Sequence, residues 1–395
     1  MTEEKIRSAA KSILDELVHI RRHLHQHPEL SFAEYKTAEY ISKKLTEWGI
    51  AHTTGVAGTG LTGILEGKST EGKIIALRAD IDALPIHEEN TTSYCSQNEG
   101  VMHACGHDVH TTCLLGALKI LKELKNEWDG KVKFIFQPGE EKLPGGASLM
   151  IKEGVLENPQ PGFILGQHVF PELETGKVGF RSGMYMASTD EIYITVTGKG
   201  GHAALPKQYN NPLLIASSLL LELDDLLMKN KAGKVPATIP TVLAFGKIEG
   251  KGATNVIPAN VEMAGTFRTM NEEWRAKAHQ LIHNTAKSVS EKTNSAVTVR
   301  IEKGYPFLVN DERVTNQMKT VAEKYLGKEN VVELDVRMTA EDFAWYSQVI
   351  PACFYRLGTR NEAKGIVSPV HSATFDIDER ALEIGAGLMA AGVML

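Results

Sequence analysis

The sequence has few cysteines and no long apolar run. Its 395 residues include four cysteines, which are Cys95, Cys105, Cys113 and Cys353. So few cysteines in so long a chain do not build a disulfide framework. We therefore expect the protein to reside in the reducing cytoplasm. No stretch is apolar over the length that crosses a bilayer. Residues 1–5 carry neither an apolar run nor a cleavage site, and we expect no signal peptide.

The chain also lacks an excess of basic residues. Lys and Arg number 43 against 49 Asp and Glu, which gives a net charge of -6. No basic patch with interleaved aromatic residues occurs, so we expect no nucleic-acid partner and no membrane partner. Internal repeats and low-complexity segments are absent as well. The hydrophobic share of 42% is ordinary for a globular protein, and the length allows two domains or one large domain with an insertion.

One stretch, residues 100–110, concentrates residues that bind metals. It holds three histidines, one cysteine and one aspartate within eight consecutive positions. Thiolate and imidazole are common ligands of divalent transition metals. Cys105 and His107 stand two residues apart, so in an extended segment they would face the same side. Apolar spacing predicts a helix over residues 111–124. A short histidine run by itself is also typical of a solvated surface.

Three apolar segments predict buried strands that lead into chemically useful side chains. The segments are residues 73–78, 131–136 and 163–168, and the side chains that follow or end them are Asp80, Asp82, Glu140, Glu141 and His168. The carboxyl ends of parallel strands are where an open α/β sheet places its ligands. The pattern therefore predicts a metal site at the rim of a mostly parallel sheet.

The neighbourhood of each side chain suggests a role. Asp82 is a candidate to hold the far nitrogen of a ligand histidine. Glu140 and Glu141 stand between a buried strand and a glycine-rich loop, which favours one carboxylate on metal and its neighbour handling protons. His371 ends a loop that needs no histidine structurally. The ligand-capable set exceeds the needs of one tetrahedral zinc and favours two ions; its members are Cys105, His107, Glu141, His168 and His371.

The middle of the chain predicts an inserted domain. Before it, helices are expected over residues 3–22 and 34–48. From residue 191 the order is strand, helix, strand, strand, helix, strand, over residues 191–198, 212–229, 242–248, 261–268, 272–291 and 296–303. This is the order of the split βαβ, ferredoxin-like motif. Afterwards we expect helices over 310–325 and 379–389, another that opens at 338–343, and a strand over 353–357.

The predicted fold is therefore α/β, with two domains. Residues 1–182 and 305–395 form a mostly parallel-sheet, metal-binding catalytic domain. Residues 183–304 form an inserted ferredoxin-like (βαββαβ) satellite domain. An insertion of this length lies within the usual size range of a domain.

Eight short motifs resemble those of one known family, the metal-dependent aminoacylase, hippurate hydrolase and carboxypeptidase-like amidohydrolases. They are RHLHQHPEL at 22–30, RADIDALP at 78–85, VMHACGHDVH at 101–110, FQPGEE at 136–141, GGHAALP at 200–206, NVIP at 255–258, GTFR at 265–268 and EDF at 341–343. Together they span essentially the whole chain. Cys105 stands where relatives use a bridging aspartate, which resembles the branch that hydrolyses N-acyl and indole-acetyl amino acids.

The resemblance implies a role for each matched residue. The residues that match the metal ligands are Cys105, His107, Glu141, His168 and His371. They would hold two divalent ions (zinc, manganese, cobalt or nickel), and the Cys105 thiolate either bridges the ions or binds one of them. Glu140 matches the general base. His202 matches a histidine that, in relatives, reaches the partner subunit's site and steadies the oxyanion. Asn255 and Arg268 match residues that contact the substrate carboxylate side. The inserted domain usually mediates dimerisation, so a homodimer is expected.

These residues predict metal-dependent hydrolysis of the amide bond of N-acyl amino acids (N-acetyl, benzoyl or aryl-acetyl) or small peptides. Metal-activated water would attack, with Glu140 as general base. The alternative is a thiol-type amidase that uses Cys105 as nucleophile, activated by His107 or His110. That alternative leaves the other metal-ligand candidates without a role. A non-catalytic metal-binding protein would have lost the base, yet Glu140 is present.

Overall fold

The computed structural model describes residues 2–395, which divide into two compact units. The first, called here the sheet unit, comprises residues 2–183, Val309–Asp335 and Asp342–Leu395. The second, called the inserted unit, comprises Met184–Leu308 and Val336–Glu341. Each unit has its own cluster of buried apolar side chains.

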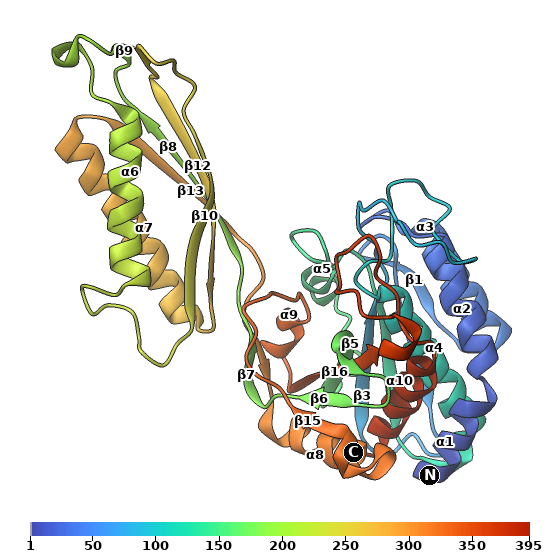
Figure 1. The fold of residues 1–395 in the computed structure, drawn as a ribbon. Helices are drawn as coiled ribbons and strands as arrows, with labels where there is room; N and C mark the ends of the chain where they lie inside the picture. The colour runs from blue at the N-terminus through green and yellow to red at the C-terminus, as the bar shows by residue number, and fades with distance from the viewer. Residues whose placement is uncertain (1) are drawn as a thin grey trace. The chain divides into compact units, whose positions relative to one another are not determined.

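An eight-stranded mixed sheet organises the sheet unit (Figure 1). Its strand order is β1-β2-β4-β3-β5-β16-β6-β15. The central strands β4, β3, β5 and β16 pair in parallel, and antiparallel pairs lie towards the edges. This confirms the predicted mostly parallel α/β sheet. The strands are β1 (Thr53–Val56), β2 (Gly60–Glu66), β3 (Ile74–Asp80), β4 (Lys131–Gln137), β5 (Phe163–Glu174), β6 (Val178–Phe180), β15 (Val331–Glu333) and β16 (Ala352–Arg360).

Helix α4 lies at the centre of the helices that cover this sheet. It packs against α10, α2 and α1 as well as β3 and β5. Because it is buried on nearly every side, even its polar first turn is out of solvent. The helices of this unit are α1 (Glu3–Ser12), α2 (Leu14–Gln26), α3 (Tyr35–Glu47), α4 (His107–Glu123), α5 (Gly146–Lys152), α8 (Glu312–Leu326), α9 (Ala344–Ser347) and α10 (Arg380–Ala391).

The inserted unit is a four-stranded antiparallel sheet with two helices on one face (Figure 1). The strand order β10-β12-β8-β13 is that of a ferredoxin-like fold, as predicted. Alternate side chains of β8 are buried against the helices, which explains its period-two pattern. The elements are β8 (Asp190–Thr197), α6 (Pro212–Leu223), β10 (Thr241–Glu249), β12 (Asn260–Thr269), α7 (Glu272–Thr293) and β13 (Ala296–Lys303).

Shorter elements complete the chain. Strands β9 (Gly201–His202) and β11 (Val256–Ile257) pair with each other, as do β7 (Gly183–Met186) and β14 (Leu308–Asn310). A π-helical turn, Asp224–Met228, follows α6. The 3-10 turns are Lys125–Glu127, Pro206–Gln208, Lys328–Asn330, Glu362–Lys364 and Gly392–Met394.

Several predicted bounds are wrong around the candidate site. The helix expected from residue 111 begins at His107, because Gly106 adopts a left-handed conformation (φ 84°) and turns the chain into the helix four residues earlier. Cys105 and His107 are therefore not part of one extended segment. The strand expected to end at His168 continues to Glu174, because β16 pairs with it in parallel well beyond that residue.

Two predicted helices differ as well. The helix expected over residues 3–22 is two helices separated at Ile13, whose backbone leaves the helical region. The helix expected to open at residues 338–343 does not form, and only the single turn α9 follows. The segment before it instead bonds to the inserted unit, where the Arg337 N–H donates to the carbonyl oxygen of Tyr185 at 2.8 Å.

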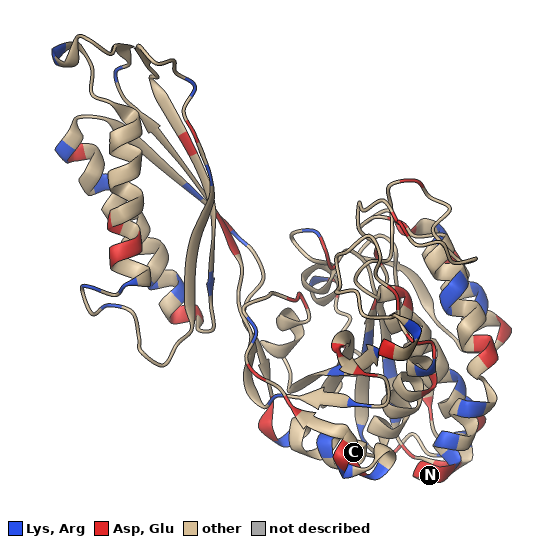
Figure 2. Ribbon diagram, in the orientation of Figure 1, with Lys and Arg blue, Asp and Glu red and all other residues tan. Residues whose placement is uncertain are grey.

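Charged residues of both signs are interspersed along the helices of the sheet unit. In Figure 2, basic and acidic positions both occur along the ribbon of α1, α2 and α8. Within residues 2–395, no helix combines the length and the apolar character needed to cross a membrane.

Candidate metal centre

Four separate segments bring potential metal ligands together in the sheet unit. The turn before α4 supplies Cys105, the first residue of α4 is His107, and β5 supplies His168. The loop after β4 supplies Glu141, and the loop before α10 supplies His371. The donor atoms of Cys105, His107 and His168 lie within 4.8 Å of one another, and so do those of Cys105, Glu141 and His371. The structure thus brings together all five predicted ligands, in two groups that share the thiol.

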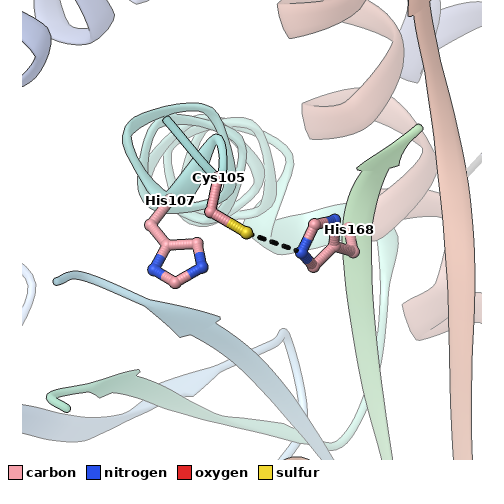
Figure 3. Close-up of side chains that lie close together, drawn as sticks. All are labelled: Cys105, His107 and His168. Carbon is pink, nitrogen blue, oxygen red and sulfur yellow. Dashed lines mark hydrogen bonds between the residues drawn. The ribbon is translucent and has the colours of Figure 1, made fainter. Parts of the chain in front are cut away.

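The sulfur of Cys105 lies between the two groups. It is 3.4 Å from Nε2 of His168 and 3.3 Å from Nε2 of His371. His371 Nε2 is in turn 3.2 Å from Oε1 of Glu141. Figure 3 shows Cys105 between His107 and His168, with its sulfur directed at the His168 ring. One thiolate at this position can reach an ion in either group.

The ring of His107 is oriented by Asp82. Nδ1 of His107 lies 3.1 Å from Oδ1 of Asp82, whose other oxygen accepts hydrogen bonds from Ser31 Oγ at 2.6 Å and from the Glu141 N–H at 3.0 Å. With Nδ1 engaged by the carboxylate, Nε2 is the ring nitrogen left to bind an ion. That Nε2 atom is buried and has no hydrogen-bond partner. A buried polar atom without a partner is costly unless something else binds it, so this donor set fits a metal ion.

His168 is oriented in the same way by the backbone. Its Nδ1 donates to the carbonyl oxygen of Val169 at 2.7 Å, which leaves Nε2 directed at Cys105. Fixing one ring nitrogen so that the other can bind is the usual arrangement of metal-binding histidines.

Glu140 lies at the edge of this cluster. Its side chain is 6% exposed. Donor atoms of Glu140, Glu141 and His107 all lie within 4.8 Å of one another. Oε1 of Glu140 accepts a hydrogen bond from the Asp342 N–H at 3.2 Å. The Asp342 carboxylate is itself held by Arg78 at 2.8 Å. The structure therefore holds Glu140 beside the ligand groups in a fixed, largely dry setting.

Comparison with known proteins identifies the chain. Residues 76–394 match the model of peptidase family M20/M25/M40. The chain belongs to this family. It is 38% identical over 367 residues to N-acetyl-L-cysteine deacetylase of Bacillus subtilis, and the alignment covers 93% of this chain and 85% of the relative. It is also 38% identical over 381 residues to IAA-amino acid hydrolase ILR1-like 4 of Arabidopsis thaliana, covering 95% and 84%.

A solved structure agrees with this assignment. The Bacillus subtilis YXEP protein, described as a dinuclear metal binding peptidase from the M20 family, superposes with a TM-score of 0.83 at 31% identity. The match covers 97% of this chain and 98% of that one. Membership of the M20 family confirms the resemblance inferred from the motifs, and the chain is a metal-dependent amidohydrolase.

The candidate ligands of this M20 chain differ in how firmly they hold protons. Burial, together with Glu141, raises the pKa of the Cys105 thiol. Hydrogen bonds to Cys105 and Glu141 raise the pKa of His371 to about 10. Burial lowers the pKa of His168 well below its ordinary value. Burial lowers the pKa of His107, but the charge of Asp80 and its other neighbours outweigh burial and raise that pKa well above its ordinary value. Metal ions bind thiolate and neutral imidazole, so an ion that entered here would displace the protons on Cys105, His107 and His371.

The remaining predicted site residues belong to the inserted unit. His202 is exposed on β9, and its Nδ1 accepts a hydrogen bond from the Ala204 N–H at 3.1 Å. Asn255 precedes β11, and its carbonyl oxygen accepts from the Ala203 N–H at 3.0 Å. Arg268 lies half-buried on β12 and donates to the carbonyl oxygen of Met338 at 3.1 Å. The structure thus places His202 and Asn255 on the same two-stranded ribbon and Arg268 on the four-stranded sheet.

Two buried residues in contact with the candidate ligands were not assigned to the metal centre from the sequence. Asp80 ends β3, and His110 lies one turn along α4 from His107. Their side chains meet, with His110 Nδ1 2.6 Å from Asp80 Oδ1. The strand-end position of Asp80 was a usable signal, but the pairing depends on α4 lying against β3.

Proposed function

We propose that this M20 enzyme hydrolyses the amide bond of N-acyl amino acids or small peptides. The relatives named N-acetyl-L-cysteine deacetylase and IAA-amino acid hydrolase support this substrate class. The observation that carries the proposal is the pair of ligand groups sharing Cys105, with Glu140 beside them.

The proposed centre holds two divalent ions, drawn from zinc, manganese, cobalt and nickel. Cys105, His107 and His168 would hold one, and Cys105, Glu141 and His371 the other, because these are the two groups whose donor atoms converge. A mixture of sulfur, nitrogen and oxygen donors suits all four metals. When bound, such ions polarise the amide carbonyl and lower the pKa of water towards ~7, which makes hydroxide available at neutral pH.

Glu140 is the proposed general base. Its buried carboxylate would accept the proton of the attacking water and then deliver it to the amide nitrogen, because an amine is a poor leaving group until it is protonated. The hydrogen bond from Asp342 keeps one oxygen of Glu140 engaged. That bond helps to hold the carboxylate beside the ligand groups.

The inserted unit is proposed to complete the site. His202 would donate a hydrogen bond to the developing oxyanion, which needs donors beyond the ions. Arg268 and Asn255 would bind the free carboxylate of the substrate, for which the planar guanidinium is suited. As in the resembling family, His202 would act at the site of a second subunit, so the proposed state is a homodimer joined through the satellite domain, residues 183–304.

The test combines metal analysis with substrate hydrolysis. Metal per chain is measured by plasma mass spectrometry, and hydrolysis of N-acetyl, N-benzoyl and N-indole-acetyl amino acids is followed before and after chelation. We expect about two ions per chain, loss of hydrolysis on chelation, and recovery with manganese or zinc. Metal-free, chelator-resistant hydrolysis would instead assign the reaction to a Cys105 thiolate.

A further inference from the structure

His110 joins the end of β3 to the middle of β5. Its Nδ1 lies 2.6 Å from Oδ1 of Asp80, and its Nε2 accepts a 2.9 Å hydrogen bond from the Val169 N–H. Both side chains and Val169 are at most 1% exposed. A backbone N–H can only donate, so Nε2 carries no proton, and the ring's single proton is the one that Nδ1 donates to Asp80.

Val169 is therefore held through both of its backbone groups. Its N–H is bound by His110, and its carbonyl oxygen accepts the 2.7 Å hydrogen bond from Nδ1 of the neighbouring His168. Its side chain packs against the turn before α4, where a Cβ on Gly106 would lie 2.5 Å from Cγ2 of Val169. The residue that orients His168 is thus fixed directly against the turn that presents Cys105 and His107.

His110 does not act as a ligand itself. Although Asp80, His107 and His110 converge within 4.8 Å, both ring nitrogens of His110 already have protein partners. The second oxygen of Asp80 accepts a hydrogen bond from Arg78 at 2.7 Å. The side chains of Asp80 and His110 are therefore bound by other protein groups and are not directed at an ion.

We propose that Asp80 and His110 form a clasp that positions His168, and thereby sets the affinity of the ion held by Cys105, His107 and His168. This inference rests on the two-ion centre proposed above. The clasp acts mainly on one ion, because His168 belongs to that group alone and the two ligands found only in the other group have separate attachments. His371 is tied through its N–H to Ala104, and Glu141 through its N–H to Asp82.

Two substitutions divide the clasp into its halves. His110→Gln places an amide oxygen near the position of Nε2 and keeps an acceptor for the Val169 N–H. His110→Asn places an amide N–H near Nδ1, so it keeps the donor to Asp80 and loses the bond to Val169. The matched control is Thr112→Val, because Thr112 is buried on the same helix and its hydroxyl donates within α4, to the carbonyl oxygen of Asp108.

The experiment titrates zinc into metal-free wild type and the three variants, in competition with a chromophoric chelator, and fits both dissociation constants. Circular dichroism and thermal unfolding of the metal-free proteins are recorded alongside. We expect His110→Asn to weaken one site about 10- to 100-fold and leave the other within about threefold, as for other residues that orient metal-binding histidines. His110→Gln should weaken the same site by a smaller factor than His110→Asn does. Thr112→Val should leave the zinc affinity of both sites unchanged.

The opposing outcomes are distinct. Unchanged dissociation constants with lower thermal stability would show that His110 is only a packing residue and would overturn the clasp. Equal weakening of both sites, or equal effects of Gln and Asn, would overturn it too. Failure of the wild type to bind two zinc ions would instead contradict the proposed function, and the clasp with it, before any variant is compared.

Discussion

The backbone N–H of His371 donates a 2.7 Å hydrogen bond to the carbonyl oxygen of Ala104. This bond attaches the loop before α10 to the residue that precedes Cys105. His371 itself adopts a left-handed conformation (φ 62°), which is uncommon for a residue with a side chain. Such conformations cost ~1–3 kcal/mol and cluster at functional sites. Here the strained backbone brings the imidazole within 3.3 Å of the Cys105 sulfur.

Replacing the base should separate metal binding from turnover. Glu140→Gln keeps the size of the side chain and the acceptor for the Asp342 N–H, but it removes the proton acceptor. We expect kcat to fall about 10²- to 10⁴-fold while metal per chain stays at the wild-type level. Glu157→Gln, a change outside the cluster, is the control. Wild-type turnover in Glu140→Gln would exclude Glu140 as the base.

Removing the shared sulfur should remove metal. Cys105→Ala takes a donor from both ligand groups, so we expect metal content and hydrolysis to fall together. Cys113→Ala removes a fully buried thiol on α4 that is not among the candidate ligands, and should retain both. Metal analysis and a chelator titration of each variant provide the measurement. A Cys105→Ala protein with full metal but no activity would point to a nucleophilic thiol.

Metal affinity should rise with pH. The His371 imidazolium, whose pKa is raised to about 10 by Cys105 and Glu141, must lose its proton before it binds an ion. Calorimetric zinc titrations in buffers of different ionisation enthalpy should show protons released on binding at pH 7 to 8. Binding without proton release would mean that the ligands are already deprotonated in the metal-free chain.

The same group predicts how pH affects the metal-free protein. Since folding raises the pKa of His371 from its ordinary 6.5 to about 10, its contribution to stability is complete below about pH 6.5 and is lost as the pH rises through about 10. Urea unfolding of the metal-free wild type should therefore show stability falling over that window. His371→Ala should show a smaller fall. An equal fall in both proteins would assign the effect to other groups.

Gly106 should tolerate no side chain, for two separable reasons. Its φ of 84° disfavours any L-residue, and an added Cβ would lie 2.5 Å from Val169. Gly100 has a similar φ of 74° with nothing within 4 Å of such a Cβ. Gly100→Ala should therefore cost about 1 to 2 kcal/mol, and Gly106→Ala about 1 to 3 kcal/mol more from overpacking. Urea unfolding measures both, and equal costs would contradict the contact with Val169.

Arg268 should govern substrate affinity. Arg268→Gln removes the proposed fork for the substrate carboxylate, so we expect KM to rise about 10- to 100-fold, the usual cost of a hydrogen bond to a charged group. Arg268→Lys should not restore it, because an ammonium cannot bind a carboxylate through two parallel bonds. Arg300→Gln, on an exposed strand of the same unit, is the control. An unchanged KM in Arg268→Gln would place carboxylate recognition elsewhere.

The residues around the candidate site show how far sequence reasoning reaches. The positions of Asp82 and Glu140 after buried strands were predictable, because apolar runs mark strands and the sheet orders their ends. The start of α4 was not, because it depends on the left-handed backbone of Gly106, which no hydrophobic pattern reveals. The hydrogen bond from the Val169 N–H to the His110 ring was equally unpredictable. It depends on how a helix packs across strands far apart in the sequence.

The boundary of the inserted unit shows the same limit. The ferredoxin-like order followed from alternating and helical spacing within residues 191–303. The return of residues 336–341 to that unit rests on backbone bonds such as that from Arg337 to Tyr185. Backbone hydrogen bonds are available to almost every residue, so the side chains gave no signal.

The ligands proposed for the two ions are spread unevenly along the chain. Four lie within the first 168 residues, whereas His371 follows His168 by 203 positions (371 - 168), with the whole inserted unit between them. At a synthesis rate of about 5 to 20 residues per second, the last ligand leaves the ribosome roughly 10 to 40 seconds after the fourth. Completion of the proposed second ligand group therefore depends on a residue that is synthesised after the whole inserted unit.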